Sequence, residues 1–145
     1  MKETSHLDVV ADAENLEKLV DWIASFCLSH SPAAEFEFQI NLCVEELFLN
    51  VVHHTKDSVK SNALVHFSLW PQTEGVVLVV EDTGAQFNPL TDAPEPDINL
   101  SIEDRPIGGL GLKLIKEMSN KTSYQRVNDM NRLMLVFGHG PLLEN

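Results

Sequence analysis

Basic residues are scarce in this chain, in which 10 Lys and Arg stand against 22 Asp and Glu and the formal net charge at pH 7 is −12. Duplex binding depends on neutralising phosphates with lysine and arginine, so this balance argues against a nucleic-acid-binding surface. The same charge suits the attraction of a basic protein partner.

Long apolar runs and cysteines are also scarce. No run approaches the roughly 20 residues that a membrane-spanning helix requires, and the first six residues lack the apolar stretch of a secretory signal. We therefore expect a cytoplasmic protein without a membrane segment. The two cysteines, Cys27 and Cys43, lie in apolar helical patterns without metal-ligand spacing, and we expect them to be buried free thiols.

What is present is the composition of one globular domain, which we place over residues 1–145. Periodicity predicts three helices: from Asp12 or Ala13 to a break at Ser31-Pro32, from about Ala34 to Thr55, and over Leu110 to Met118. It also predicts a first strand over His6 to Val10 and a hairpin of Ala63 to Trp70 and Val76 to Glu81, joined through Pro71 to Gly75. A closing hairpin of Thr122 to Val127 and Arg132 to Phe137 is predicted around Asn128 to Asn131. This order implies an α+β fold, a two-layer sandwich with helices on one face of a mixed, mostly antiparallel sheet.

A long segment from Thr83 to Ile107 is rich in Gly, Pro, Asp and Asn and has no periodic pattern. A loop of this length inside a compact domain is typically a functional lid. We therefore predict a lid over about residues 83–107.

Three glycines follow this lid, at Gly108, Gly109 and Gly111, directly before an apolar helical pattern. Glycine lets backbone approach a ligand closely, and the start of a helix presents free N–H groups and a partial positive charge. A phosphate-binding site is one interpretation, and a tight connection between two elements is the other.

The second predicted helix carries polar residues within an apolar pattern. Glu46, Asn50 and His54 follow one another at four-residue spacing and so share one face. Unpartnered polar groups beside a core cost about 1–3 kcal/mol each, so three in line suggest a site. The alternative is the solvated edge of an amphipathic helix.

An acidic turn follows the apolar strand Val76 to Val80. Its aspartate, Asp82, could accept a hydrogen bond from an exocyclic amine, and Gly84 could let a flat ring approach the backbone. An ordinary Asp-x-Gly turn is the alternative. Phe87 is interpreted as an anchor for the lid more than as a contact to a base.

Together the three segments resemble the nucleotide-binding domain shared by gyrase B, the Hsp90 chaperones, histidine kinases and MutL. They are most similar to the anti-sigma-factor serine kinases of bacterial stress-response and sporulation circuits. The matching stretches are Glu46-x-x-x-Asn50-x-x-x-His54, then Asp82-x-Gly84-x-x-Phe87-Asn88-Pro89, then Gly108-Gly109-Leu110-Gly111-Leu112-x-Leu114-Ile115. Their order and spacing agree, and the resemblance covers almost the whole chain.

The resemblance implies a role for each motif. Glu46 would be the general base, Asn50 would supply an oxygen to Mg²⁺, and Asp82 would bind the adenine amino group of ATP or ADP. Further nucleotide contacts would come from His54, Gly84, Phe87, Arg105, Gly108, Gly109, Leu110, Gly111 and Leu112. Lys113 is either a phosphate partner or a solvated helix position.

The implied function is that of an ATP-dependent protein serine/threonine kinase acting as an anti-sigma factor. It would phosphorylate a STAS-type anti-sigma-factor antagonist, bind a sigma factor and form a homodimer. The alternative is a non-catalytic ATP/ADP-binding switch that sequesters a regulatory partner. Glu46 favours the enzyme, because a switch needs the metal site at Asn50 but no base.

Overall fold

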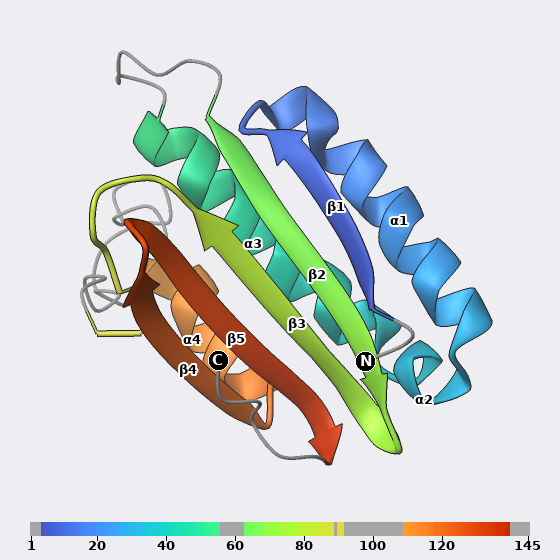
Figure 1. The fold of residues 1–145 in the computed structure, drawn as a ribbon. Helices are drawn as coiled ribbons and strands as arrows, with labels where there is room; N and C mark the ends of the chain where they lie inside the picture. The colour runs from blue at the N-terminus through green and yellow to red at the C-terminus, as the bar shows by residue number, and fades with distance from the viewer. Residues whose placement is uncertain (1–3, 56–62, 89, 92–108, 140–145) are drawn as a thin grey trace.

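A computed structural model describes residues 4–55, 63–88, 90–91 and 109–139. The elements are β1 (Ser5–Val10), the 3₁₀ helix η1 (Ala13–Asn15), α1 (Leu16–Ser29), α2 (Ser31–Ala34), α3 (Glu37–Thr55), β2 (Leu64–Gln72), β3 (Glu74–Asp82), α4 (Gly109–Met118), β4 (Lys121–Val127) and β5 (Met130–His139). Five strands form one sheet in the order β1-β2-β3-β5-β4, with α1, α3 and α4 on one face (Figure 1). The predicted two-layer α+β sandwich is confirmed. The sheet was expected to be mixed, but every pairing of the described strands is antiparallel.

The main core lies between the sheet and the helices, because alternate residues of each strand point to that face. Phe67 of β2 is fully buried there, and its ring lies 6.1 Å from that of Phe48 in α3 and 6.3 Å from that of Trp22 in α1. Burying one such side chain contributes about 1.5–3 kcal/mol. Among the described helices, none is long and apolar enough to span a bilayer.

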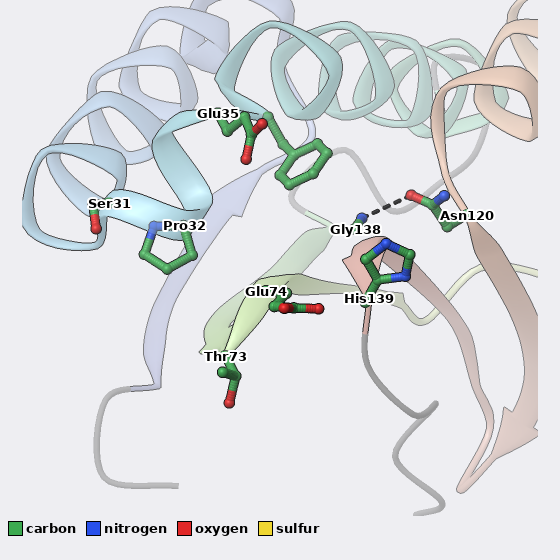
Figure 2. A pocket seen from close by; sticks show the side chains of 9 residues that line it. Ser31, Pro32, Glu35, Thr73, Glu74, Asn120, Gly138 and His139 are labelled. Atoms are coloured by element: carbon green, nitrogen blue, oxygen red, sulfur yellow. Dashed lines mark hydrogen bonds between the residues drawn. The ribbon is translucent and has the colours of Figure 1, made fainter.

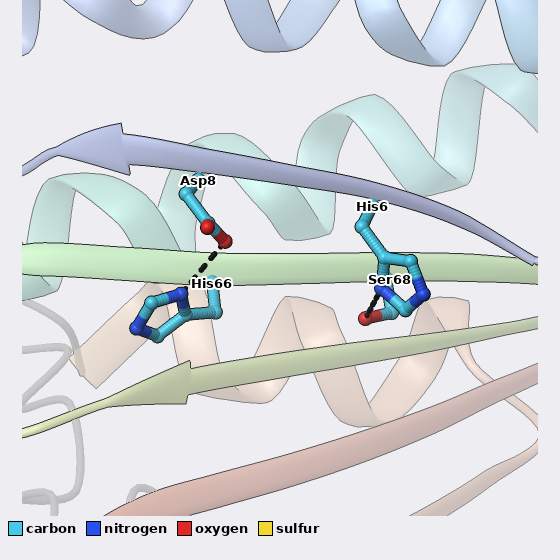
Figure 3. A network of polar contacts seen from close by, with 4 residues as sticks. All are labelled: His6, Asp8, His66 and Ser68. Atoms are coloured by element: carbon cyan, nitrogen blue, oxygen red, sulfur yellow. Dashed lines mark hydrogen bonds and ion pairs between the residues drawn. The ribbon is translucent and has the colours of Figure 1, made fainter.

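The opposite face of the sheet carries a second, smaller apolar cluster. It consists of Trp70, Val77, Val79, Met134 and Val136. Towards β1 the same face becomes polar. There Nδ1 of His66 lies 2.7 Å from Oδ1 of Asp8, and Nδ1 of His6 lies 2.9 Å from Oγ of Ser68 (Figure 3). These contacts are solvent-accessible, so they contribute little to stability.

The break predicted at Ser31-Pro32 ends α1, but the chain turns directly into another helix. Pro32 lies in the first turn of α2, where its missing N–H and fixed φ are tolerated. The following helix α3 consequently begins at Glu37 and not near Ala34.

Both hairpins are tighter than predicted. Gln72 pairs with Gly75, so a tight turn at Thr73 and Glu74 replaces the expected five-residue connection. In the closing hairpin Asn128 and Asp129 have φ values of 51° and 62°, the pair of positive φ angles that a type I′ turn requires. Asn131, expected in the turn, therefore lies in β5.

Both cysteines are buried free thiols, as predicted. Burial, followed by the charge of Glu37, raises the pKa of Cys27 from 9.0 to about 11. Burial, followed by the charge of Glu46, raises the pKa of Cys43 from 9.0 to about 12. The reactive thiolate is thereby suppressed in the folded chain.

At pH 8 we expect Cys27 of the folded protein to react with a disulfide reagent about a hundredfold, and Cys43 about a thousandfold, more slowly than in the chain unfolded in guanidinium chloride, one factor of ten per pKa unit. The raised pKa values stabilise the fold below pH 9, and this contribution is lost as the pH rises towards 11–12. Rapid modification of two thiols in the native protein would contradict the burial.

Candidate functional site

Asp82 is the last residue of β3 and lies on the helix-covered face of the sheet. Its strand is buried on both faces from Gly75 to Val80, and alternation places Asp82 on the same face as Val80 and Leu78, which belong to the main core. The sheet order inserts β5 beside β3, and the register pairs Asp82 with Asn131. The carboxylate thus emerges at the edge of the core with an amide beside it.

The carboxylate of Asp82 is held by one of its two oxygens. Oδ1 accepts hydrogen bonds from the backbone N–H of Gly84 at 2.9 Å and from Nδ2 of Asn131 at 3.1 Å. Oδ2 has no partner among the residues that the structure describes. One acceptor oxygen of this half-buried carboxylate is therefore not used by the described residues.

Gly84 makes this arrangement possible. A Cβ atom built on Gly84 would lie 2.9 Å from Oδ1 of Asp82, a distance that real Cβ atoms essentially never show. The missing side chain leaves room for the carboxylate. This is a separate reason for glycine from the close approach of a ring, which the sequence suggested.

The side chain of Asn131 makes the central hydrogen bonds that hold the turn after Asp82. It is 8% exposed and is the one buried polar residue in the described part of the chain. Its Nδ2 also donates to the carbonyl of Ala85 at 2.9 Å, while its Oδ1 accepts from the N–H of Phe87 at 3.1 Å, the hydroxyl of Tyr124 at 2.6 Å and Nη1 of Arg126 at 3.2 Å. Every hydrogen-bonding position of the amide is used, as burial requires.

Two further contacts hold the turn. Nη1 of Arg126 donates to the carbonyl of Gly84 at 2.8 Å, which ties β4 to the turn. Oδ1 of Asn88 accepts from the N–H of Leu90 at 2.9 Å, and Leu90 packs against the core. Phe87 is anchored through its backbone. The start of the segment predicted as a lid is therefore fixed to the sheet, and residues 92–107 lie outside the described residues.

Sequence reasoning missed Asn131, Tyr124 and Arg126. An Asn-Asp pair suits a two-residue type I′ turn, and a strand starting directly after it would place Asn131 on the same face as Leu133. The position of Asn131 could therefore have been predicted from the sequence. The insertion of β5 beside β3 could not have been predicted, because no local pattern encodes strand order.

Glu46 and Asn50 are half-buried on α3, and neither side chain has a hydrogen-bond partner in the part of the chain that the structure describes. Phe48 packs towards Phe67 and thus towards the α1 side of the sheet. Residues two positions apart on a helix lie roughly 160° apart around its axis. Glu46 and Asn50 therefore point away from Phe48 on α3, and α4 is one of the helices that pack against α3.

The pKa of Glu46 is raised from its ordinary value of 4.5, first by burial and then by the charge of Glu45. Both effects disfavour the ionised carboxylate. A carboxylate with a raised pKa is a stronger proton acceptor once ionised, which is the property of a general base.

The helix predicted after the glycines is confirmed as α4, which begins at Gly109. Ile115 is fully buried and fixes α4 to the core, whereas Lys113 is exposed. The other predicted phosphate-side contacts cannot be placed: Arg105 and Gly108 lie outside the described residues, as do the side chains of His54, Leu110 and Leu112.

A hollow of about 690 Å³ lies at the other end of the sheet, between α2, the β2–β3 turn and the end of β5 (Figure 2). Glu74, which lines it, opens β3 while Asp82 closes it, a separation of roughly 27 Å along an extended strand. Its lining includes the carboxylates of Glu35 and Glu74 and neither lysine nor arginine. The hollow is therefore unsuited to a triphosphate and separate from the site at Asp82.

The chain matches the family of histidine kinase-like ATPase domains over residues 9–137. It therefore belongs to this family. It is also similar to the serine/threonine-protein kinase BtrW of Bordetella bronchiseptica, with 29% identity over 139 residues that cover 96% of each chain. The family and the relative together identify a kinase-like ATPase that binds ATP or ADP. Glu46 and Asn50 on α3 and the turn that follows Asp82 lie in the matched region.

Replacing Gly84 with alanine should displace the Asp82 carboxylate and weaken ATP binding about tenfold, the size of one hydrogen bond to a charged group. Ala85→Ser is the matched control, because Ala85 is exposed in the same turn. Isothermal titration calorimetry with Mg²⁺ measures both affinities. Equal affinities of the two variants would show that the carboxylate geometry is not required.

Proposed function

We propose that this chain is an ATP-dependent protein serine/threonine kinase that acts as an anti-sigma factor. The observation that carries the proposal is the position of Glu46, a half-buried carboxylate one turn from Asn50 on α3 that has no hydrogen-bond partner among the described residues. A protein that only binds nucleotide has no use for a base at this position. The name of the Bordetella relative, a serine/threonine-protein kinase, agrees with this choice.

The described residues fit an adenine nucleotide with Mg²⁺. Oδ2 of Asp82, which has no partner among the described residues, is an acceptor of the kind that the adenine amino group needs, and the amide oxygen of Asn50 is a hard ligand suited to Mg²⁺. The ion would neutralise phosphate charge. That assistance matters in a protein with a formal net charge of −12.

In the proposed reaction Glu46 accepts the proton of a serine or threonine hydroxyl on the protein substrate. The hydroxyl oxygen receives the phosphoryl group of ATP, and ADP is left. Phosphoryl transfer depends mainly on alignment and charge neutralisation, so one base, one metal ligand and a fixed adenine are sufficient protein machinery.

The proposed protein substrate is a STAS-type anti-sigma-factor antagonist, and the proposed second partner is a sigma factor. Both follow from the resemblance of the motifs to anti-sigma-factor kinases. The acidic charge suits a partner with a basic surface. The homodimer implied by the same resemblance would have about twice the 16.2 kDa mass of the chain in light scattering.

Replacing Glu46 with glutamine should lower phosphoryl transfer at least about a hundredfold, the usual contribution of a general base, and leave ATP affinity nearly unchanged. Glu45→Gln is the matched control, since it removes the same charge from the exposed neighbouring position. Transfer of label from ATP to the antagonist measures the rate. If Glu46→Gln transfers label as fast as Glu45→Gln, Glu46 is not the base.

The raised pKa of Glu46 also predicts how the stability of the Glu46→Gln variant compares with that of the natural chain. A raised pKa favours the fold only while the group is protonated, and this contribution is lost as the pH rises through the folded-state value. Glu46→Gln should therefore have a Tm at or above that of the natural chain at pH 7. The difference should shrink at pH 4, and a lower Tm at pH 7 would contradict the sign.

Incubating the chain with Mg²⁺, labelled ATP and a candidate antagonist should place the label on serine or threonine. EDTA should abolish transfer. A pull-down with purified sigma factor, with and without the antagonist, tests the second partner. ATP binding without any transfer would instead support the non-catalytic switch.

A further inference from the structure

Helix α3 is apolar on its outward side as well as on the side that packs against the sheet. Ile40 and Leu47 are buried in the main core. Phe38 and Leu42 each lie two residues from Ile40 and so point roughly 160° away from it around the helix axis. Leu49 lies two residues from Leu47 and points away from it in the same way. Phe38, Leu42 and Leu49 therefore share one outward direction, and we call them the outward apolar stripe.

The composition of this stripe is typical of a contact surface. A helix in an outer layer usually carries polar residues on its solvent side, and a helix that is apolar all round is usually covered on that side too. The exposed fraction of Phe38 is 68%, although large aromatic side chains contribute most when they are buried. Leu42 and Leu49 are half-buried. An exposed ring in line with two leucines suits burial against another protein.

The outward apolar stripe borders Glu46. Leu42 precedes Glu46 by four residues and Leu49 follows it by three, the two spacings at which side chains on a helix are neighbours. Phe38 lies eight residues before Glu46, roughly 12 Å away along the helix axis. A protein that seats on the stripe thus covers the surroundings of the proposed base, while Phe38 itself is too distant to take part in proton transfer.

The helices around the stripe are acidic. From Leu16 to Thr55 the sequence has one lysine, Lys18, no arginine and six carboxylates, which are Glu17, Asp21, Glu35, Glu37, Glu45 and Glu46. An exposed carboxylate contributes little alone, but several together attract a basic surface and repel a second copy of the same acidic face. Charge complementarity therefore favours a different, basic protein as the occupant of the stripe.

We propose that the outward apolar stripe is the docking surface for the protein substrate, and that the substrate carries an apolar patch with basic residues beside its acceptor hydroxyl. This inference rests on the proposed kinase activity and on Glu46 as its base. Docking on Leu42 and Leu49 brings the hydroxyl to Glu46 and covers the base, which hinders water from taking the phosphoryl group. Phe38 is a docking residue that does not touch the reacting atoms.

Replacing Phe38 with serine should raise the KM for the protein substrate about tenfold, the usual loss at an aromatic contact in the centre of an interface. The kcat should stay within about twofold, because the lost contact is the same in the ground state and the transition state. Leu64→Ser is the matched control. Leu64 is 43% exposed, and its alternation with the buried Val65 places it on the opposite face of the sheet.

The measurement is transfer of label from ATP to a purified STAS-domain antagonist at varied antagonist concentration, which gives KM and kcat for each variant. Calorimetric titration with ATP and Mg²⁺ should give the same affinity for Phe38→Ser, Leu64→Ser and the natural chain. Circular dichroism checks folding, which the exposed position of Phe38 leaves intact.

The charge of the substrate surface is tested at the same position. Phe38→Lys and Phe38→Glu both remove the ring and add opposite charges in the first turn of α3. For a basic substrate surface, KM at low ionic strength should be several-fold higher for Phe38→Lys than for Phe38→Glu. The difference should vanish in about 1 M salt, where the Debye length is about 3 Å. Equal KM values at low ionic strength, or a lower KM for Phe38→Lys, would overturn the basic partner.

The outcomes separate the inference from the proposed function. ATP binding without transfer of label by the natural chain contradicts the proposed kinase and the inference with it. Transfer by the natural chain, together with equal KM values for Phe38→Ser and Leu64→Ser, overturns the inference alone. So does a lower molecular mass of Phe38→Ser in light scattering with an unchanged KM, which would show that a second copy of the chain occupies the stripe.

Discussion

A carboxylate tied down by one oxygen is the constraint on which the site depends. An aspartate at the end of a strand can rotate freely, and a rotating carboxylate recognises an amine poorly. Two donors on Oδ1 of Asp82, from Gly84 and Asn131, remove that freedom before any ligand arrives. Binding energy that would otherwise order the carboxylate remains for the nucleotide.

The sheet topology supplies the second of these donors. Because β5 lies between β3 and β4, the strand that ends at Asp82 runs beside the strand that begins near Asn131. A buried asparagine costs stability unless its hydrogen bonds are satisfied. Here both ends of the amide are used, so the polar group lies at the edge of the core without an unpaired atom and holds the turn from Gly84 to Phe87 in place.

The helix layer positions Glu46 and Asn50 on α3 in a corresponding way. Phe48 and its buried neighbours hold α3 on the sheet, which leaves Glu46 and Asn50 half-buried outside the core. Partial burial there raises the pKa of Glu46 without sealing it from solvent. A carboxylate with these two properties suits the role proposed for Glu46, that of a base for a hydroxyl group delivered by another protein.

Much of this could be predicted from the sequence, and the failures have identifiable causes. The 3.6-residue period predicted α1, α3 and α4, and the apolar run Val76 to Val80 predicted a fully buried strand, because these signals are local. The hairpin turns were placed too wide, and the short helix at Pro32 was taken for a break, because a single proline suits both a loop and a first helical turn.

In the candidate site, too, the residues with a local sequence signal could be predicted and the others could not. Glu46, Asn50, Asp82 and Gly84 could be predicted as site residues because each belongs to a short motif with fixed spacing. Asn131 was assigned to a turn, although its alternation with Leu133 on β5 would have placed it on the core face. Arg126 carries no local signal, since its contact with the carbonyl of Gly84 spans 42 residues of sequence.

Where the nucleotide binds can be measured directly by following the amide resonances of ¹⁵N-labelled protein during titration with ADP and Mg²⁺. The account predicts shifts at the backbone amide of Gly84, the side-chain amide of Asn131 and the α3 amides near Asn50, with the amides of Thr73 and His139 unmoved. Shifts confined to the hollow around Glu74, or no shifts at saturating ADP, would contradict it.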